Sequence, residues 1–218
     1  MQDCRNFTSM CQMMSSDAFS YISRFVTLSE AEKTLFGSHL QIMTCFPKQV
    51  LTSVGELEQH VYFVQKGIVR KYFCRDNFEV TVQLALEGDL ISSNVSFLSG
   101  VLSDYVIETL EPATLAFITK SSLETLYSYS HNFEKMGRLI LLEWMLDKER
   151  RDTSRMINTP KERYLALLKE KPQLLSRVPQ KYLASLLNIE PETFSRYKKL
   201  FDFHIEPFET EADAYTGV

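Results

Sequence analysis

The chain is 218 residues long, with 44% hydrophobic residues, 24% charged residues and a formal net charge of −4. This length can bury a sizeable core in one or two domains, and the composition is that of a folded protein, not of a disordered or fibrous one. No apolar run approaches the roughly 20 residues that span a bilayer, and no secretion signal is visible, so we expect a cytoplasmic protein.

The first 120 residues change from a helical to an extended pattern. Residues 15–38 predict two short helices, and Ser29 with Glu32 forms a capping box that opens the second. Short β-rich runs then follow, separated by turns that mostly contain Gly, at 40–46, 61–64, 68–73, 80–86, 105–110 and 113–118. Antiparallel strands at this interval favour a barrel of the jelly-roll kind.

From Ser121 the pattern is helical, with a short helix at 123–129 and a long one from His131 to about Ile157. The centre of the long helix, 139–146, is apolar nearly all round, which requires cover on two sides. We expect one side to lie on the barrel and the other to meet its copy in a homodimer. The predicted dimer residues repeat about every 3.5 positions: Met136, Leu139, Glu143, Leu146, Arg150 and Thr153. Burial inside a monomer is the alternative.

Residues 178–201 predict two short helices joined by a tight turn. Ala184 lies where the helices cross, facing Phe194, and Asn188 occupies a turn position that needs a positive φ. This layout is typical of a helix-turn-helix, whose second helix enters the DNA major groove. An ordinary helical hairpin with a polar outer face is the alternative.

The polar face of this segment suits DNA. Arg can bind a guanine edge, Glu can accept from cytosine N4, and Ser, Thr and Lys suit phosphates or bases, with Arg196 as the first candidate. The predicted DNA-binding residues are Gln180, Lys181, Glu192, Thr193, Ser195, Arg196, Lys198 and Lys199. Residues 160–201 carry nine Lys/Arg and four Asp/Glu, whereas 202–218 carry five acids and no Lys/Arg. The basic surplus therefore coincides with the predicted DNA-binding segment.

A barrel, a long helix and a helix-turn-helix in this order resemble the Crp/Fnr family of bacterial transcription regulators, over roughly residues 20–201. Residues 61–69 resemble the family's strand-turn-strand, and 86–91 the start of its phosphate-binding cassette. The most specific match is 183–196, Leu-Ala-Ser-Leu-Leu-Asn-Ile-Glu-Pro-Glu-Thr-Phe-Ser-Arg.

The resemblance implies an α+β fold with an N-terminal antiparallel jelly roll. The expected domains are a cyclic-nucleotide-binding-like effector domain at 1–130, a dimerisation helix at 131–158 and a DNA-binding domain with an acidic tail at 159–218. The implied partners are double-stranded DNA and a second copy of the chain.

The cassette departs from the pattern of family members that bind cyclic nucleotides. Their Gly-Glu pair for the ribose corresponds to Ser92-Ser93, and their Arg-Ser or Arg-Thr pair for the phosphate to Ser103-Asp104. A cyclic phosphate needs a cationic partner, and none stands here. We therefore predict that cyclic AMP is not a physiological ligand. The candidate lining for an unidentified small-molecule effector is Ser92, Ser93, Ser103, Asp104 and Lys148; these are alternatively polar loop residues without a ligand.

Other chemistry is not predicted. Some relatives hold an iron–sulfur cluster on N-terminal cysteines, but Cys4 and Cys11 are too few and too widely spaced, and the four cysteines match no zinc pattern. The four histidines are scattered and no Gly-rich phosphate loop occurs, so we expect no enzyme, cofactor or metal site.

The family's β-hairpin wing looks shortened or absent after Phe201. The rival function is a signalling or protein-interaction module that has lost operator binding.

Overall fold

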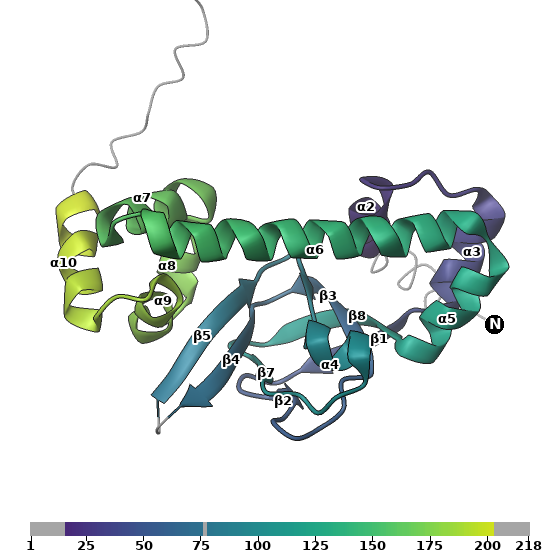
Figure 1. Ribbon diagram of the computed structural model, residues 1–218, viewed down its shortest axis with the longest axis horizontal. Coiled ribbons are helices and arrows are strands. Elements are labelled where there is room, and N and C mark those ends of the chain that lie inside the picture. The colour runs from purple at the N-terminus through teal and green to yellow at the C-terminus, as the bar shows by residue number, and fades with distance from the viewer. Residues whose placement is uncertain (1–15, 76–77, 203–218) are drawn as a thin grey trace, which may run out of the picture. The chain divides into compact units, whose positions relative to one another are not determined.

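The computed structural model describes residues 16–75 and 78–202. The chain divides into two compact units between Thr153 and Ser154, inside the long helix α6 (His131–Ile157). Figure 1 labels helices and strands of both units. Among the described residues, no helix is both long and apolar enough to cross a membrane.

Unit 1 contains two antiparallel sheets of four strands each, which confirms the predicted jelly-roll class. The first sheet has the order β1 (Gln41–Cys45), β8 (Ala113–Thr119), β3 (His60–Lys66) and β6 (Leu90–Ile91). The second has the order β2 (Val50–Thr52), β7 (Val106–Thr109), β4 (Val69–Arg75) and β5 (Phe78–Ala85). Strands far apart in sequence therefore lie side by side.

The helices of unit 1 include α2 (Ser16–Ser23), α3 (Glu30–His39), α4 (Asn94–Ser99), α5 (Lys120–Tyr129) and the first part of α6. The capping box of α3 is confirmed: Glu32 N–H donates to Ser29 Oγ at 3.3 Å, and Ser29 N–H donates to Glu32 Oε2 at 2.8 Å. Strands β2 and β6 and helix α4 were not predicted, since segments of two to six residues carry almost no periodicity.

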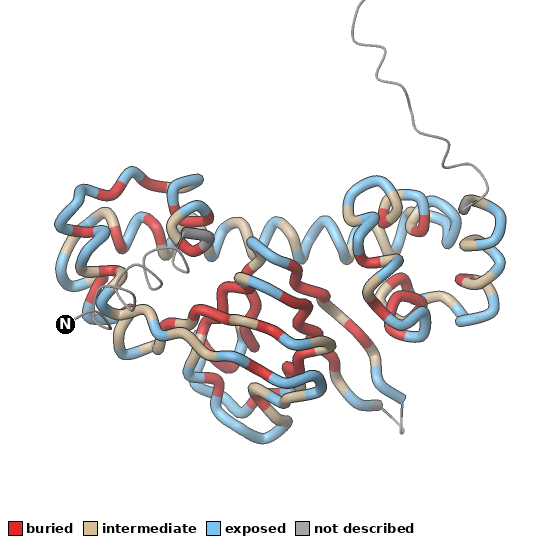
Figure 2. The backbone as a smooth tube through the Cα atoms, turned by 180° about the vertical axis from the view of Figure 1, so that it is seen from behind, coloured by how far each residue is buried: buried red, intermediate tan, exposed pale blue. Residues whose placement is uncertain are grey.

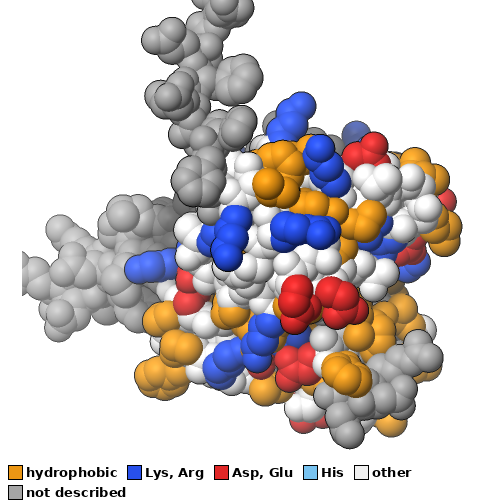
Figure 3. Space-filling model, turned by 90° about the vertical axis from the view of Figure 1, so that its left-hand side faces the viewer, with side chains coloured by type: hydrophobic (Ala, Val, Ile, Leu, Met, Phe, Trp, Pro, Cys, Tyr) orange, Lys and Arg blue, Asp and Glu red, His pale blue; other side chains and the backbone are white. Residues whose placement is uncertain are grey.

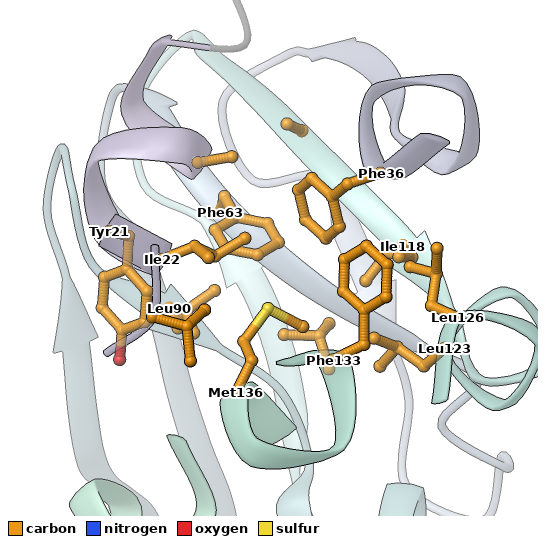
Figure 4. Packing of buried hydrophobic residues seen from close by; sticks show 14 of the residues in the cluster. Tyr21, Ile22, Phe36, Phe63, Leu90, Ile118, Leu123, Leu126, Phe133 and Met136 are labelled. Carbon is orange, nitrogen blue, oxygen red and sulfur yellow. The ribbon is translucent and has the colours of Figure 1, made fainter. Parts of the chain in front are cut away.

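The first sheet is buried on both faces, as the alternation of side chains along β3 shows. Val61 and Phe63 belong to a core cluster with side chains from α2, α3, α5 and α6, whereas Tyr62 and Val64 belong to a second cluster inside the barrel. Buried backbone accordingly concentrates along the strands (Figure 2). In the first cluster Met136 points from α6 toward the rings of Phe63 and Phe133 (Figure 4).

Unit 2 consists of α7 (Pro160–Glu170), α8 (Gln173–Arg177), α9 (Gln180–Leu187) and α10 (Pro191–Asp202), together with the end of α6. Thr159 caps α7 with Pro160 at its first position, as predicted. The ring of Tyr164, fully buried, lies 5.3 Å from Phe194, 5.7 Å from Tyr197 and 5.9 Å from Phe201. This aromatic cluster fixes α10 against α7. Residues 203–218, where the wing is predicted to be shortened or absent and the acidic tail follows, lie outside the described residues.

Candidate nucleic-acid interface and sensor residues

The turn between α9 and α10 has the predicted helix-turn-helix geometry. Asn188 takes φ 51° and ends α9, and its N–H donates to Ser185 O at 3.1 Å. Ile189 N–H donates to Ala184 O at 3.0 Å, and Ala184 is only 1% exposed. A helix commonly ends with a residue in the left-handed backbone conformation, followed by an N–H that donates to a carbonyl five residues earlier. The residues of the turn itself therefore set its geometry.

Arg163 of α7 holds this turn from outside, a contact that was not predicted. Its Nε donates to Leu187 O at 2.9 Å and its Nη2 to Asn188 O at 3.3 Å. These carbonyls stand at the end of α9, where helical partners run out. The guanidinium fork therefore satisfies the C-terminus of α9 and fixes the angle at which the chain enters α10.

One face of α10 forms a shallow hollow, lined by Pro191, Glu192, Ser195, Arg196, Lys199 and Leu200. It brings together half of the predicted DNA-binding residues: Glu192, Ser195, Arg196 and Lys199. Thr193 and Lys198 are half-buried beside it, and Gln180 and Lys181 are exposed in the first turn of α9. On the side of the molecule toward α10, Lys and Arg side chains stand out as separate groups, not as one continuous patch (Figure 3).

The cations of this face are available to a ligand. Within the described part of the chain, no ion pair joins Arg196, Lys198 or Lys199 to an acid. Glu192 lies on the same face, so the hollow combines one carboxylate with two cations and a hydroxyl. Such a mixture can discriminate between base edges more finely than a purely basic surface.

The predicted dimer residues of α6 divide into two groups. Met136 is only 2% exposed in the core of its own chain, and Glu143 accepts from Tyr21 Oη at 2.6 Å and pairs with Arg24, so both face inward. Leu139 is half-buried, Leu146 and Thr153 are exposed, and Arg150 pairs with Asp147. The exposed apolar surface, called the α6 strip below, consists of Leu141, Leu142, Met145 and Leu146. Of the predicted dimer residues, only Leu146 belongs to this strip.

Of the predicted sensor residues, three serines come together. Ser103 Oγ donates to Ser93 Oγ at 2.8 Å, Ser92 Oγ donates to His60 O at 2.9 Å, and all three serines are buried. Asp104 is exposed, and Lys148 is exposed and paired with Asp152 at 2.6 Å. Neither Asp104 nor Lys148 is hydrogen-bonded to the serines.

Glu58 and Lys71 stand beside the serines, and sequence reasoning missed both. The Glu58 carboxylate, 1% exposed, accepts from Thr52 Oγ1 at 2.7 Å, from His60 N–H at 3.0 Å and from Ser93 N–H at 3.4 Å. Lys71 Nζ donates to Ser92 O at 2.9 Å. The N–H of Ser93, which could hold a bound anion, therefore already donates to a carboxylate of the chain itself, and Lys71 donates to a backbone carbonyl.

The charge of Lys71 is affected by this setting. Burial, and to a smaller extent the nearby Arg151, lowers the pKa of Lys71 to about 8, and Glu58 opposes both effects. The burial of Lys71 could have been predicted from the sequence. Lys71 lies two residues from Val69 on one strand, so both side chains point to the inward face. No group of three or more His, Cys, Asp or Glu side chains in the described residues is placed to hold a metal ion.

A comparison with family models gave no match, and a comparison with curated protein sequences gave none either. Solved structures do match. FixK2 from Bradyrhizobium japonicum is 18% identical, over 75% of this chain and 85% of FixK2, with a TM-score of 0.66. The c-di-GMP-responsive global regulator CLP of Xanthomonas campestris is 19% identical, over 80% of this chain and 92% of CLP, with a TM-score of 0.61.

A third match is a regulator assigned to the crp/fnr family from Eubacterium rectale. It is 16% identical, over 81% of this chain and 84% of that one, with a TM-score of 0.63. At such identities the likeness establishes architecture: the chain has the fold of the Crp/Fnr regulators, the fold that its own motifs predict.

Proposed function

We propose that the chain is a dimeric DNA-binding transcription regulator of the Crp/Fnr type. The observation that carries the proposal is the polar face of α10, where Ser195, Arg196 and Lys199 line one hollow and, among residues 16–75 and 78–202, no acid pairs with either cation. Helix α10 is held in place by the Arg163 fork and by the rings around Tyr164. A rigid helix with such a face has the properties of a recognition helix.

On this proposal α10 enters the major groove with its hollow toward the bases. Arg196 binds a guanine edge through two hydrogen bonds, and Lys199 neutralises a phosphate. Glu192 accepts from cytosine N4 and repels phosphates, so α10 binds well only where its carboxylate meets a base edge. Specificity then comes from Arg196 and Glu192, and affinity from the lysines.

The second part of the proposal is a homodimer formed through the α6 strip. Leu142, Met145 and Leu146 are 41%, 60% and 43% exposed in the single chain. Fully burying an apolar side chain of this size contributes about 1.5–3 kcal/mol. An isolated chain leaves these side chains in water, whereas a dimer would bury them. Two copies related by a two-fold axis would present two α10 helices to one duplex.

The third part concerns the sensor domain, for which we propose a signal other than cyclic AMP. Glu58 occupies Ser93 N–H, and a cyclic phosphate placed there would meet this buried carboxylate. Lys71, a buried cation, donates to Ser92 O. Two like charges brought together in a buried site repel each other strongly, which disfavours a cyclic phosphate beside Glu58.

A protein-interaction module that has lost operator binding is the competing function. Glu192 favours it, because a carboxylate on the exposed face of α10 weakens non-specific attraction to DNA. The two functions differ in salt dependence, since phosphate contacts release counterions from DNA and protein contacts do not.

The experiment measures fluorescence anisotropy of labelled duplexes with the full chain over a series of salt concentrations. We expect affinity to fall steeply with salt, and Arg196→Ala to reduce discrimination at one base pair by roughly 1–3 kcal/mol. Lys169→Ala removes an exposed cation of α7 outside the hollow and serves as the control. Base preference that is unchanged by Arg196→Ala, or affinity that does not respond to salt, would favour the interaction module.

A further inference from the structure

Unit 1 contains a cavity of about 630 Å³ on the helix-facing side of the first sheet. Its walls come from strands β3, β6 and β8 and from helices α2 to α6, and include Phe36, Phe63, Phe97, Tyr127, Met136 and Trp144. Val61 and Phe63 line it, whereas Tyr62 and Val64 point to the other side of the sheet. The cavity is therefore distinct from the serine cluster. Its volume falls within the range of about 300–1,000 Å³ that small-molecule sites occupy.

The interior of the cavity is apolar and adaptable. The rings of Phe36 and Phe63 meet edge to face at 6.5 Å, and Met136 points toward them from α6 (Figure 4). Methionine fills irregular space with little strain and can move aside for a ligand. Leu98 and Leu141, at 49% and 44% exposed, mark the open side.

Charged groups stand only at the mouth. His131 and Glu134 face each other there, with Nδ1 and Oε2 3.5 Å apart. Lys135 and Arg138 are exposed, three residues apart on one face of α6, and neither forms an ion pair within the described residues. Glu124 of α5 adds one carboxylate. The mouth therefore carries two cations and two carboxylates. Glu134 faces His131, whereas Lys135 and Arg138 form no ion pair within the described residues and remain open to an anion.

We propose that this cavity binds an amphipathic carboxylate, a straight-chain fatty acid or an acid of similar shape. The hydrocarbon chain would lie among the aromatic walls, and the carboxylate would bind Lys135 and Arg138 at the mouth. Binding would act on α6 directly, because Met136, Ile140 and Trp144 form one wall while Leu142, Met145 and Leu146 lie on the exposed side of the same helix. The proposal does not depend on DNA binding.

Trp144 makes the site observable, since it is the single tryptophan of the chain and lines the cavity. The full chain is titrated with decanoate, decanol and decyltrimethylammonium below their micellar concentrations while Trp144 emission is recorded. We expect a saturable change, with decanoate binding at least about tenfold more tightly than the other two probes, the value of one charge-assisted hydrogen bond. Lys135→Ala with Arg138→Ala should abolish this preference and leave the response to decanol.

Two further variants give the experiment its controls. Lys33→Ala with Lys66→Ala removes two exposed lysines outside the lining and should keep the preference. Ile140→Phe narrows the cavity at a half-buried position and should weaken decanoate and decanol alike. The proposal is overturned by the absence of a saturable change, by equal binding of the cationic probe, or by Ile140→Phe leaving the affinities unchanged.

Discussion

Glu32 illustrates how much a single residue can organise in this fold. Its carboxylate closes the capping box of α3 and also accepts from Ser130 Oγ and from Asn132 Nδ2 at the start of α6. The hydrogen bond from Ser130, followed by that from the Ser29 backbone, lowers the pKa of Glu32 from 4.5 to about 2, and burial opposes the shift. One carboxylate thus joins two helices far apart in sequence.

The lowered pKa of Glu32 gives a pH-dependent contribution to stability. Because the folded state binds the proton more weakly than the unfolded state, the stabilisation is complete above about pH 4.5 and is lost as the pH falls toward 2. Glu32→Gln should therefore lower the urea midpoint clearly at pH 7 and much less at pH 3. Glu30→Gln, at an exposed position paired with Lys33, is the matched control. A deficit of equal size at both pH values would contradict this assignment.

Arg163 makes a second residue-scale prediction. Arg163→Ala removes donors from the carbonyls of Leu187 and Asn188, and hydrogen bonds from charged groups are worth about 1.5–3 kcal/mol each. We expect faster amide hydrogen exchange at Asn188 and Ile189, together with weaker DNA binding at every sequence. Lys169→Ala, at an exposed position on the same helix, should change neither. Unchanged exchange in Arg163→Ala would show that the turn holds without the fork.

At the scale of elements, sequence patterns predicted the helices that are long or that carry their own capping residues. Helix α6 begins and ends as predicted, with 27 residues, and α7 begins at the predicted Thr159 cap. The exposed face of α10 could be predicted because it follows from the helical spacing of residues that are close in sequence. The contacts of Glu58 with Ser93 and of Arg163 with Asn188 join residues 35 and 25 positions apart, so only the folded chain reveals them.

The α6 strip yields the element-scale prediction. A Leu142→Glu, Met145→Glu double variant places two charges where an apolar dimer surface is proposed, and burying unpaired charges is far more costly than exposing them. Sedimentation velocity should find a dimer for the unaltered chain and a folded monomer for the variant. Glu149→Gln, which changes an exposed charge of the same helix, is the control. A monomeric unaltered chain would contradict the proposal for α6.

At the scale of the whole molecule, the two units divide the proposed work. Unit 1 offers a cavity and a long helix, and unit 2 offers a rigid cationic face on α10. The total charge of −4 conceals this division, because residues 160–201 carry five more basic than acidic side chains. The proposed dimer would present two α10 faces and would therefore make twice as many phosphate contacts as one chain. A modest surplus of basic side chains in each chain would then be enough for DNA binding.

The most direct test of the central claim is selection of binding sites from a pool of random duplexes by the full chain. A dimer that presents two α10 helices predicts a two-fold symmetric site whose half-sites lie one helical turn, about 10–10.5 base pairs, or a multiple of it apart. Enrichment of such a site, lost with Arg196→Ala, is the expected result. A pool that stays random, or that yields one unrepeated motif, would contradict the account.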